Sequence, residues 1–389
     1  MINFKISAPG RIVLSGEYGA IYGKHVVLAS LNRYTKLEFQ ELPVETKNII
    51  IKFPGVKLSL KVFLVVINEF MSAENFQDMI KNHFRFSKLL QSLITLNNMW
   101  ITNEQKFSLK MFFFLLMHIA NDEKLDIKSF RVHVSTDLMI GAGLGSSSSF
   151  AVCLSACFLH WARLQKGAHS EFNREDLISI SKYAKLSEKV LQSCKFETDN
   201  DVCCYGNIIE FRYINQEDNY PTGIIDTPAI NIMLVDLKFP FVMGERARLI
   251  AEKKHFDPET VNIILTICDG ISDSICRALK DIKYFSDDPD LFQTEQERAY
   301  VTLQMFVRLH QHVLSELLHP MLKRMSSIAL DCVEISLGKF AGYEGNFAYI
   351  LLPPNLLLEE QTTNLITRLK REGFDVTMTS VSCNGVTID

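Results

Sequence analysis

Apolar positions along the chain follow two different spacings, and each spacing predicts a different kind of element. Residues 33–40 and 48–53 are rich in β-branched and aromatic side chains, so we expect the first 53 residues to form strands. Between 57 and 120 apolar residues recur every three or four positions, which predicts helices ending in an apolar helix over 107–120. Residues 130–135 alternate again and predict a strand that leads into a glycine cluster.

The spacing of apolar residues also predicts the elements of the rest of the chain. An apolar stripe from Phe150 to Leu164 predicts a helix that begins near Ser146–Ser148. Cys203-Cys204 is assigned to a strand, and the polar interval 216–228, with two prolines and a glycine, is the candidate domain boundary. The remaining elements are expected to be helices over 175–193, 244–254, 258–282, 295–316 and 356–371, and strands over 207–213, 230–236, 347–352 and 374–379.

Composition places the chain among globular proteins of two domains. It has 389 residues, 47% hydrophobic and 22% charged, with a net charge of −4. No stretch combines basic and aromatic residues, so we expect neither nucleic acid nor a membrane as partner. The most apolar window, 111–120, is about half the ~20 residues of a membrane span. Nine cysteines without Cys-x-x-Cys spacing, and no leader-like N-terminus, favour a reducing, cytoplasmic location.

Three of the 18 glycines lie within five residues, at 141, 143 and 145. They stand between a predicted strand and a predicted helix, where glycine lets the backbone approach a ligand and the first N–H groups of the helix favour an anion. The serines at 146–149 can cap that helix or bind a phosphate-bound Mg²⁺. Phosphate is therefore the expected ligand, and the alternative is a glycine-rich turn with a serine cap.

Other polar residues supply what phosphoryl transfer needs. Arg11 directly follows a Pro-Gly turn, and Glu17 comes six residues later. Glu188 on a predicted helix and Asp199 in the loop expected to follow it add two carboxylates. Backbone donors, carboxylates for Mg²⁺ and for the acceptor hydroxyl, and a fixed cation are the parts that such a reaction uses.

These motifs resemble those of the GHMP small-molecule kinases. Ala-Pro-Gly-Arg over 8–11 and Gly-Ala-Gly-Leu-Gly-Ser-Ser over 141–147 are similar to the first two signatures of that superfamily. Within it, Ser-Gly-Glu-Tyr-Gly-Ala-Ile-Tyr-Gly-Lys over 15–24 is most similar to the mevalonate kinase family. The resemblance implies a two-domain α+β fold, with a ribosomal-S5-like domain over 1–226, a ferredoxin-like domain over 227–389 and the active site in the cleft between them.

The resemblance also assigns roles. It implies ATP as co-substrate, Mg²⁺ as cofactor and the 5-hydroxyl of mevalonate as acceptor. Asp199 and Arg11 would be catalytic, Ser147 and Glu188 would bind the metal, and Glu17 and Tyr18 would contact the acceptor. The ATP site would consist of Thr136, Gly141, Ala142, Gly143, Leu144, Gly145, Ser146 and Ser147.

The chain departs from the mevalonate kinase pattern at several positions. Arg11 stands where lysine is usual and Tyr18 where histidine is usual. The third glycine motif retains Gly342 and Gly345, with Tyr343 and Glu344 in space that is usually bare backbone. Two alternatives therefore stay open: a GHMP kinase acting on a sugar or another alcohol, and a homologue that binds nucleotide or a small ligand without turnover. A homodimer, and the role of 57–120, are likewise open.

Overall fold

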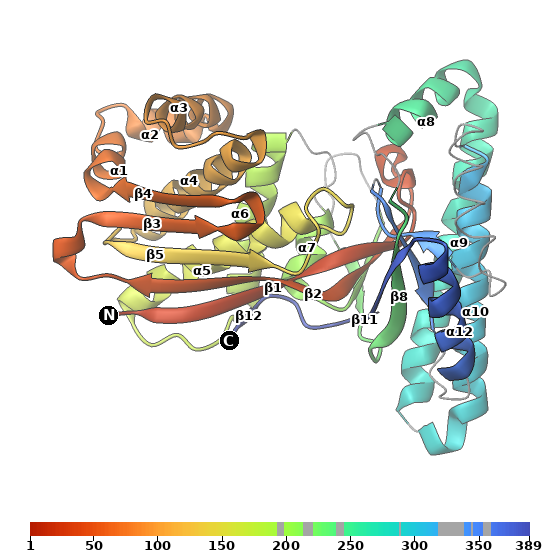
Figure 1. Ribbon diagram of the computed structural model, residues 1–389. Helices are drawn as coiled ribbons and strands as arrows, with labels where there is room; N and C mark the ends of the chain where they lie inside the picture. Colours follow the sequence, from red (N-terminus) through yellow and green to blue (C-terminus); the bar gives the residue numbers. More distant parts are fainter. Residues whose placement is uncertain are drawn as a thin grey trace.

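The computed structural model describes residues 1–192, 198–212, 221–238, 245–287, 289–317, 338–343, 345–352 and 359–389. Figure 1 shows strands running through the molecule, with helices gathered around both ends of the sheet. The strands are β1 Asn3–Ser15, β2 Val26–Glu41, β3 Asn48–Phe53, β4 Leu58–Phe63, β5 Phe130–Thr136, β6 Ile208–Phe211, β7 Pro221–Ile225, β8 Ile230–Asp236, β9 Gly338–Phe340, β10 Phe347–Leu351, β11 Asp375–Val381 and β12 Thr387–Ile388. The helices are α1 Leu64–Met71, α2 Phe76–Lys81, α3 His83–Leu96, α4 Asn103–Glu123, α5 Ser146–Lys166, α6 Arg174–Gln192, α7 Thr198–Tyr205, α8 Glu245–Phe256, α9 Pro258–Ser286, α10 Pro289–Ser315 and α12 Glu359–Arg371.

The strands form one sheet, whose main path is β4-β3-β5-β2-β11-β8-β10-β9. The long strand β2 lies at its centre and pairs with β1, β5, β6 and β11. β12 pairs with β1, and both termini lie on the same side of the molecule (Figure 1). The end of the chain therefore lies against its first strand, although the helices α8–α12 between them cover the opposite end of the sheet.

The two halves of the sheet meet at a narrow junction. β2 and β11 are joined by the pair Leu31 and Val381. Beside it, Ser30 accepts a backbone hydrogen bond from Ser382, and the Ser30 hydroxyl bonds to the carbonyl oxygen and the amide of Cys383 at 2.8 Å each. Ser30 is fully buried. Asn32 adds two bonds, to the Ser380 hydroxyl and from the Thr379 hydroxyl, so the contact between these strands consists of a few hydrogen bonds around Ser30 and Asn32.

Two central helices bear out the apolar patterns read from the sequence. In α4, every residue from Met111 to Ala120 is buried, which confirms the prediction of a buried helix over 107–120. The apolar stripe of α5 packs against β1 and β2 and includes the fully buried Trp161.

α9 and α10 pack against each other as a long hairpin at the other end of the molecule (Figure 1). Among the described helices, none combines the length and apolar character that crossing a membrane requires.

Three local predictions were wrong. Residues 58–63 form strand β4 instead of a helix, because Leu58 and Val62, four residues apart, can share one face in either structure. Cys203 and Cys204 lie in helix α7 instead of a strand. Every residue from Thr198 to Cys204 is buried, so the spacing of apolar residues does not distinguish a helix from a strand here. Asp199 accordingly lies in the first turn of α7 and not in a loop. Part of the interval 216–228 is strand β7, paired with β6. Residues 213–220 lie outside the described residues, and the domain boundary in this interval stays a prediction.

Candidate active site

The glycine cluster forms the loop between β5 and α5. The φ angles of Gly141, Gly143 and Gly145 are 76°, 80° and 76°, values that residues with a Cβ rarely adopt. Between them, Ala142 and Leu144 are buried and hold the loop against the core. The loop therefore contains three residues in the left-handed region of φ and ends at the N-terminus of α5. The N–H groups there have no helical partners and favour an anion.

A cavity of about 490 Å³ adjoins this loop. Gly141, Ser146 and Ser147 line its loop side, and Thr136 lines it from the end of β5. The other walls are largely apolar and come from the β3–β4 turn, α4 and α5; they include Phe53, Val56, Phe107 and Phe150. An apolar cavity beside an anion-binding loop has the chemistry to accept a flat heteroaromatic ring whose attached phosphates reach the loop.

Arg11 joins the loop to the predicted catalytic aspartate. Its Nη2 lies 2.5 Å from Oδ2 of Asp199, and its Nη1 donates to the carbonyl oxygen of Gly143 at 2.5 Å. Both side chains of the ion pair are buried. Burial alone would lower the pKa of Arg11, but attraction to the Asp199 carboxylate outweighs it and raises the pKa above its usual value. The fold thus brings together two groups that are 188 positions apart in the sequence.

Glu188 lies within a group of oxygen and amide side chains from three helices. Its carboxylate accepts hydrogen bonds from the Ser148 hydroxyl at 3.0 and 3.2 Å and from the Asn200 amide at 2.8 Å. Burial raises the pKa of Glu188, and hydrogen bonds from Ser147 and Asn200 partly offset that rise. The predicted metal ligands Ser147 and Glu188 are therefore neighbours, one on α5 and the other on α6.

These residues fit Mg²⁺. Oδ1 of Asp199 and Oδ1 of Asn200 are buried and accept no hydrogen bond from any described residue. Magnesium prefers hard oxygen ligands such as carboxylates and hydroxyls. Ser147 and Glu188 supply a hydroxyl and a carboxylate of this kind, and Asn200, which bonds to Glu188, adds a buried amide oxygen that accepts no hydrogen bond from a described residue.

Glu17 and Tyr18, predicted to contact the acceptor, both contact the C-terminal half. Glu17 is buried, forms an ion pair with the fully buried Lys339 and lies 3.8 Å from His310. The Tyr18 hydroxyl donates a hydrogen bond to the carbonyl oxygen of Tyr343. His310 Nε2 in turn accepts a bond from the backbone amide of Gly16 at 3.0 Å. These contacts hold the segment that follows β1 against β9 and α10, and the acceptor role of both residues stays a prediction.

The third glycine motif packs directly on the phosphate loop. A Cβ at Gly342 would lie 2.2 Å from the carbonyl oxygen of Gly143, and a Cβ at Gly345 would lie 2.1 Å from that of Ala142. Tyr343 is buried, and its ring centroid lies 5.3 Å from the Arg11 guanidinium. The Tyr343 side chain is thus part of the core, whereas Glu344 lies outside the described residues.

Several site residues were missed from the sequence. From the sequence, no individual role is assigned to Ser148, which lies in the run of serines at 146–149, or to Asn200. The pattern S-S-S-S at the start of α5 could have suggested that consecutive hydroxyls face the metal site and the core. Lys339 and Arg246, which donates to the Gly345 carbonyl at 3.3 Å, gave no local signal.

Comparison with known proteins agrees with this geometry. Residues 113–195 match the GHMP kinases N terminal domain family. Human mevalonate kinase is 26% identical over 400 residues, covering 98% of this chain and 94% of its own length. Two solved structures share the fold: mevalonate kinase from Methanococcus jannaschii, with a TM-score of 0.66, 16% identity and coverage of 97% of this chain and 98% of its own, and L. major mevalonate kinase in complex with R-mevalonate, with a TM-score of 0.63, 14% identity and coverage of 98% and 96%.

The phosphate loop, the domain matched over residues 113–195 and the fold are all similar to those of one class of protein, the GHMP kinases. Within that class, the relatives that match almost its whole length are mevalonate kinases, from animals, fungi and Dictyostelium discoideum.

Proposed function

We propose that this chain is a mevalonate kinase, which transfers the γ-phosphoryl group of ATP to the 5-hydroxyl of mevalonate and yields 5-phosphomevalonate. The observation that carries the proposal is the buried ion pair between Arg11 and Asp199 beside the phosphate loop. The pair places an acceptor-activating carboxylate and a fixed cation next to the site where phosphates bind. The relatives along 98% of the chain favour mevalonate over a sugar as the acceptor.

Each residue has a distinct task in this mechanism. The buried Oδ1 of Asp199, which has no hydrogen-bond donor among the described residues, accepts or orients the proton of the attacking hydroxyl. Arg11 holds the other carboxylate oxygen in place and provides positive charge where negative charge develops on the transferred group. The cavity lined by Thr136 holds the base of ATP, and the loop from Gly141 to Ser147 holds its phosphates.

Ser147 and Glu188 would hold Mg²⁺ beside these phosphates. When bound, the ion would neutralise negative charge on the ATP phosphates. Asn200 and Ser148 orient the Glu188 carboxylate through the hydrogen bonds described above. The described cysteines are free thiols, which supports activity in a reducing compartment such as the cytoplasm.

A coupled assay of ADP release tests the proposal. Purified protein with ATP and Mg²⁺ is expected to release ADP with mevalonate and not with galactose or homoserine. Asp199→Asn should lower kcat by orders of magnitude and leave ATP binding measured by calorimetry largely unchanged. Asp201→Asn is the matched control, because Asp201 lies in the same turn of α7 but pairs with Lys185 at 2.7 Å. Binding of ATP by folded protein without turnover on any acceptor would instead support the nonenzymatic homologue.

A further inference from the structure

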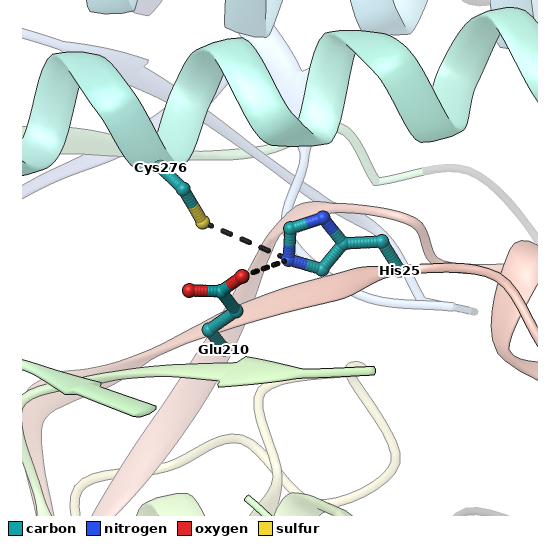
Figure 2. Close-up of side chains that lie close together, drawn as sticks. All are labelled: His25, Glu210 and Cys276. Carbon is teal, nitrogen blue, oxygen red and sulfur yellow. Dashed lines mark hydrogen bonds and ion pairs between the residues drawn. The ribbon is translucent and has the colours of Figure 1, made fainter. Parts of the chain in front are cut away.

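Three side chains of different chemistry converge where α9 packs on the sheet. They are His25, which directly precedes β2, Glu210 on β6 and Cys276 on α9 (Figure 2). Nε2 of His25 lies 3.3 Å from Oε1 of Glu210 and 3.7 Å from Sγ of Cys276. All three residues are buried, with exposed fractions of 4%, 7% and 2%. Imidazole, carboxylate and thiol are the side-chain groups that bind zinc in proteins.

The two separations measured from His25 match a tetrahedral zinc site. With Zn–N of ~2.0–2.1 Å, Zn–O of ~2.0–2.2 Å and Zn–S of ~2.3 Å, tetrahedral angles place nitrogen about 3.3 Å from oxygen and about 3.6 Å from sulfur. The corresponding distances here are 3.3 and 3.7 Å. All three atoms lie within 4.8 Å of one another, so one ion can be shared among them, with water completing the coordination.

The second ring nitrogen of His25 is held as in known zinc sites. Nδ1 lies 2.9 Å from Oδ1 of Asp273, one turn before Cys276 on α9. Histidines that bind a metal commonly donate their other N–H to a carboxylate, which fixes the ring and the tautomer. With the proton on Nδ1, the lone pair of Nε2 points toward Glu210 and Cys276 (Figure 2).

That tautomer leaves an unfavourable contact in the absence of an ion. The lone pair of Nε2 then faces a carboxylate oxygen at 3.3 Å, and two acceptors without a proton between them repel each other. The long contact with Cys276 supplies at most a weak S–H donor. A cation bound to all three groups would remove this repulsion.

We propose that His25, Glu210 and Cys276 form a structural zinc site that fastens α9 to strands β2 and β6. The site is separate from the Arg11–Asp199 pair and shares no residue with it. It adjoins the segment 16–24, which carries Glu17 and Tyr18, and His25 is also held through its backbone amide by Asp269 of α9 at 2.7 Å. Zinc would thus fix the end of that segment on the helical hairpin of the C-terminal half.

The cluster lies close to the protein surface. Asp273 and Arg212 lie at its rim, and their side chains are 44% and 48% exposed. Arg212 donates to Oε1 of Glu210 at 2.8 Å and to Oδ1 of Asp273 at 2.6 Å, and Lys280 lies 3.5 Å from Oε2 of Glu210. The competing interpretation is that these cations alone neutralise the two acids, so that the cluster is an ordinary ion-pair network.

Cobalt substitution separates the two interpretations. The metal-free full-length protein is titrated with Co²⁺ and then with Zn²⁺, and absorption is recorded together with metal content. We expect about one ion per chain, tetrahedral cobalt bands and a thiolate-to-cobalt charge-transfer band that zinc abolishes. Cys276→Ser should abolish the charge-transfer band, and Asp273→Asn should weaken affinity by about 10-fold to 100-fold.

Two cysteine variants are matched controls. Cys268→Ser removes another buried thiol of α9, and Cys203→Ser removes the thiol near Asp199 and Glu188; both should retain the cobalt spectrum. Glu210→Gln, nearly identical in shape, provides a second test if Cys276→Ser does not fold, and it should weaken cobalt binding at least tenfold. The proposal is overturned if folded wild-type protein gives no charge-transfer band, or if folded Cys276→Ser or Glu210→Gln binds cobalt as the wild type does.

Discussion

Gly342 lies so close to Gly143 that a β-carbon at position 342 would come within 2.2 Å of the Gly143 carbonyl oxygen. The contact joins the reduced third glycine motif to the phosphate loop and accounts for the glycine at 342. It also means that the two loops must move together, because neither backbone can yield without displacing the other.

Gly342→Ala is therefore expected to lower both stability and kcat. The added methyl group meets backbone, so we expect a loss of about 1–3 kcal/mol in the free energy of unfolding and a raised KM for ATP. Denaturant unfolding and ADP release measure the two effects. Gly270→Ala on α9 is the control, since nothing outside the adjacent helix backbone lies within 4 Å of its Cβ position, and it should be neutral or stabilising by up to about 1 kcal/mol. Unchanged kinetics in Gly342→Ala would mean that the loops are not coupled.

Arg11→Lys should lower kcat even though related kinases carry lysine there. The Arg11 fork reaches both Asp199 and the Gly143 carbonyl, whereas one ammonium cannot reproduce both bonds in the same geometry. Loss of one charge-assisted hydrogen bond, worth about 1.5–3 kcal/mol, corresponds to roughly 10- to 100-fold in rate. Steady-state kinetics checks the change. Equal or higher kcat would show that the site accepts the usual residue without adjustment.

Glu17→Gln should destabilise the protein because it leaves Lys339 buried without its counter-charge. Removing one partner of a buried ion pair costs about 3–5 kcal/mol, and the pair here is almost fully buried. The double variant Glu17→Gln with Lys339→Met should lose less than the sum of the two single losses. Glu38→Gln is the control, since its partner Lys5 is exposed and such pairs contribute about 0–1 kcal/mol. A stable Glu17→Gln protein with a raised KM for mevalonate would instead make acceptor binding the main role of Glu17.

Features that depend on local interactions could be predicted from the sequence, whereas contacts between distant segments could not. The glycines at 141, 143 and 145 could be interpreted because positive φ is a property of single residues. The stripe of α5 could be recognised because helical packing repeats every three or four residues. The pairing of Glu17 with Lys339, 322 positions apart, leaves no such pattern, because either residue alone looks like an ordinary surface charge. The same holds for His25, Glu210 and Cys276, which three separate elements bring together.

Val56→Trp tests the assignment of the cavity beside the phosphate loop. Val56 lines that cavity, and an indole there would occupy space assigned to the base of ATP. We expect KM for ATP to rise by about tenfold or more, which corresponds to at least 1.4 kcal/mol of lost affinity, with KM for mevalonate little changed. Val44→Trp, at a position 77% exposed, should leave both constants unaltered. A raised KM for mevalonate alone would move the ATP site elsewhere.

Stability should fall as the pH drops from about 6.5 toward 4, partly because of His118. Burial and the nearby His83 lower the pKa of His118 to about 4. Below pH 6.5 the unfolded chain therefore binds a proton that the folded chain does not, and the free energy of unfolding decreases, by up to roughly 3 kcal/mol for this group. His118→Leu should flatten this part of the pH profile of unfolding. An unchanged slope in His118→Leu would assign the acid sensitivity to other groups.

The junction at Ser30 has a consequence for how the two halves of the molecule are linked mechanically. Because backbone hydrogen bonds run from β2 into β11 and the tail, the two halves cannot separate about a free linker without breaking them. The amide of Val13 on β1 also donates to the carbonyl oxygen of Ala341 at 2.8 Å, and Glu17 pairs with Lys339. A force on the C-terminal half would therefore be transmitted to β1 and β2, and β1 is the strand that carries Arg11.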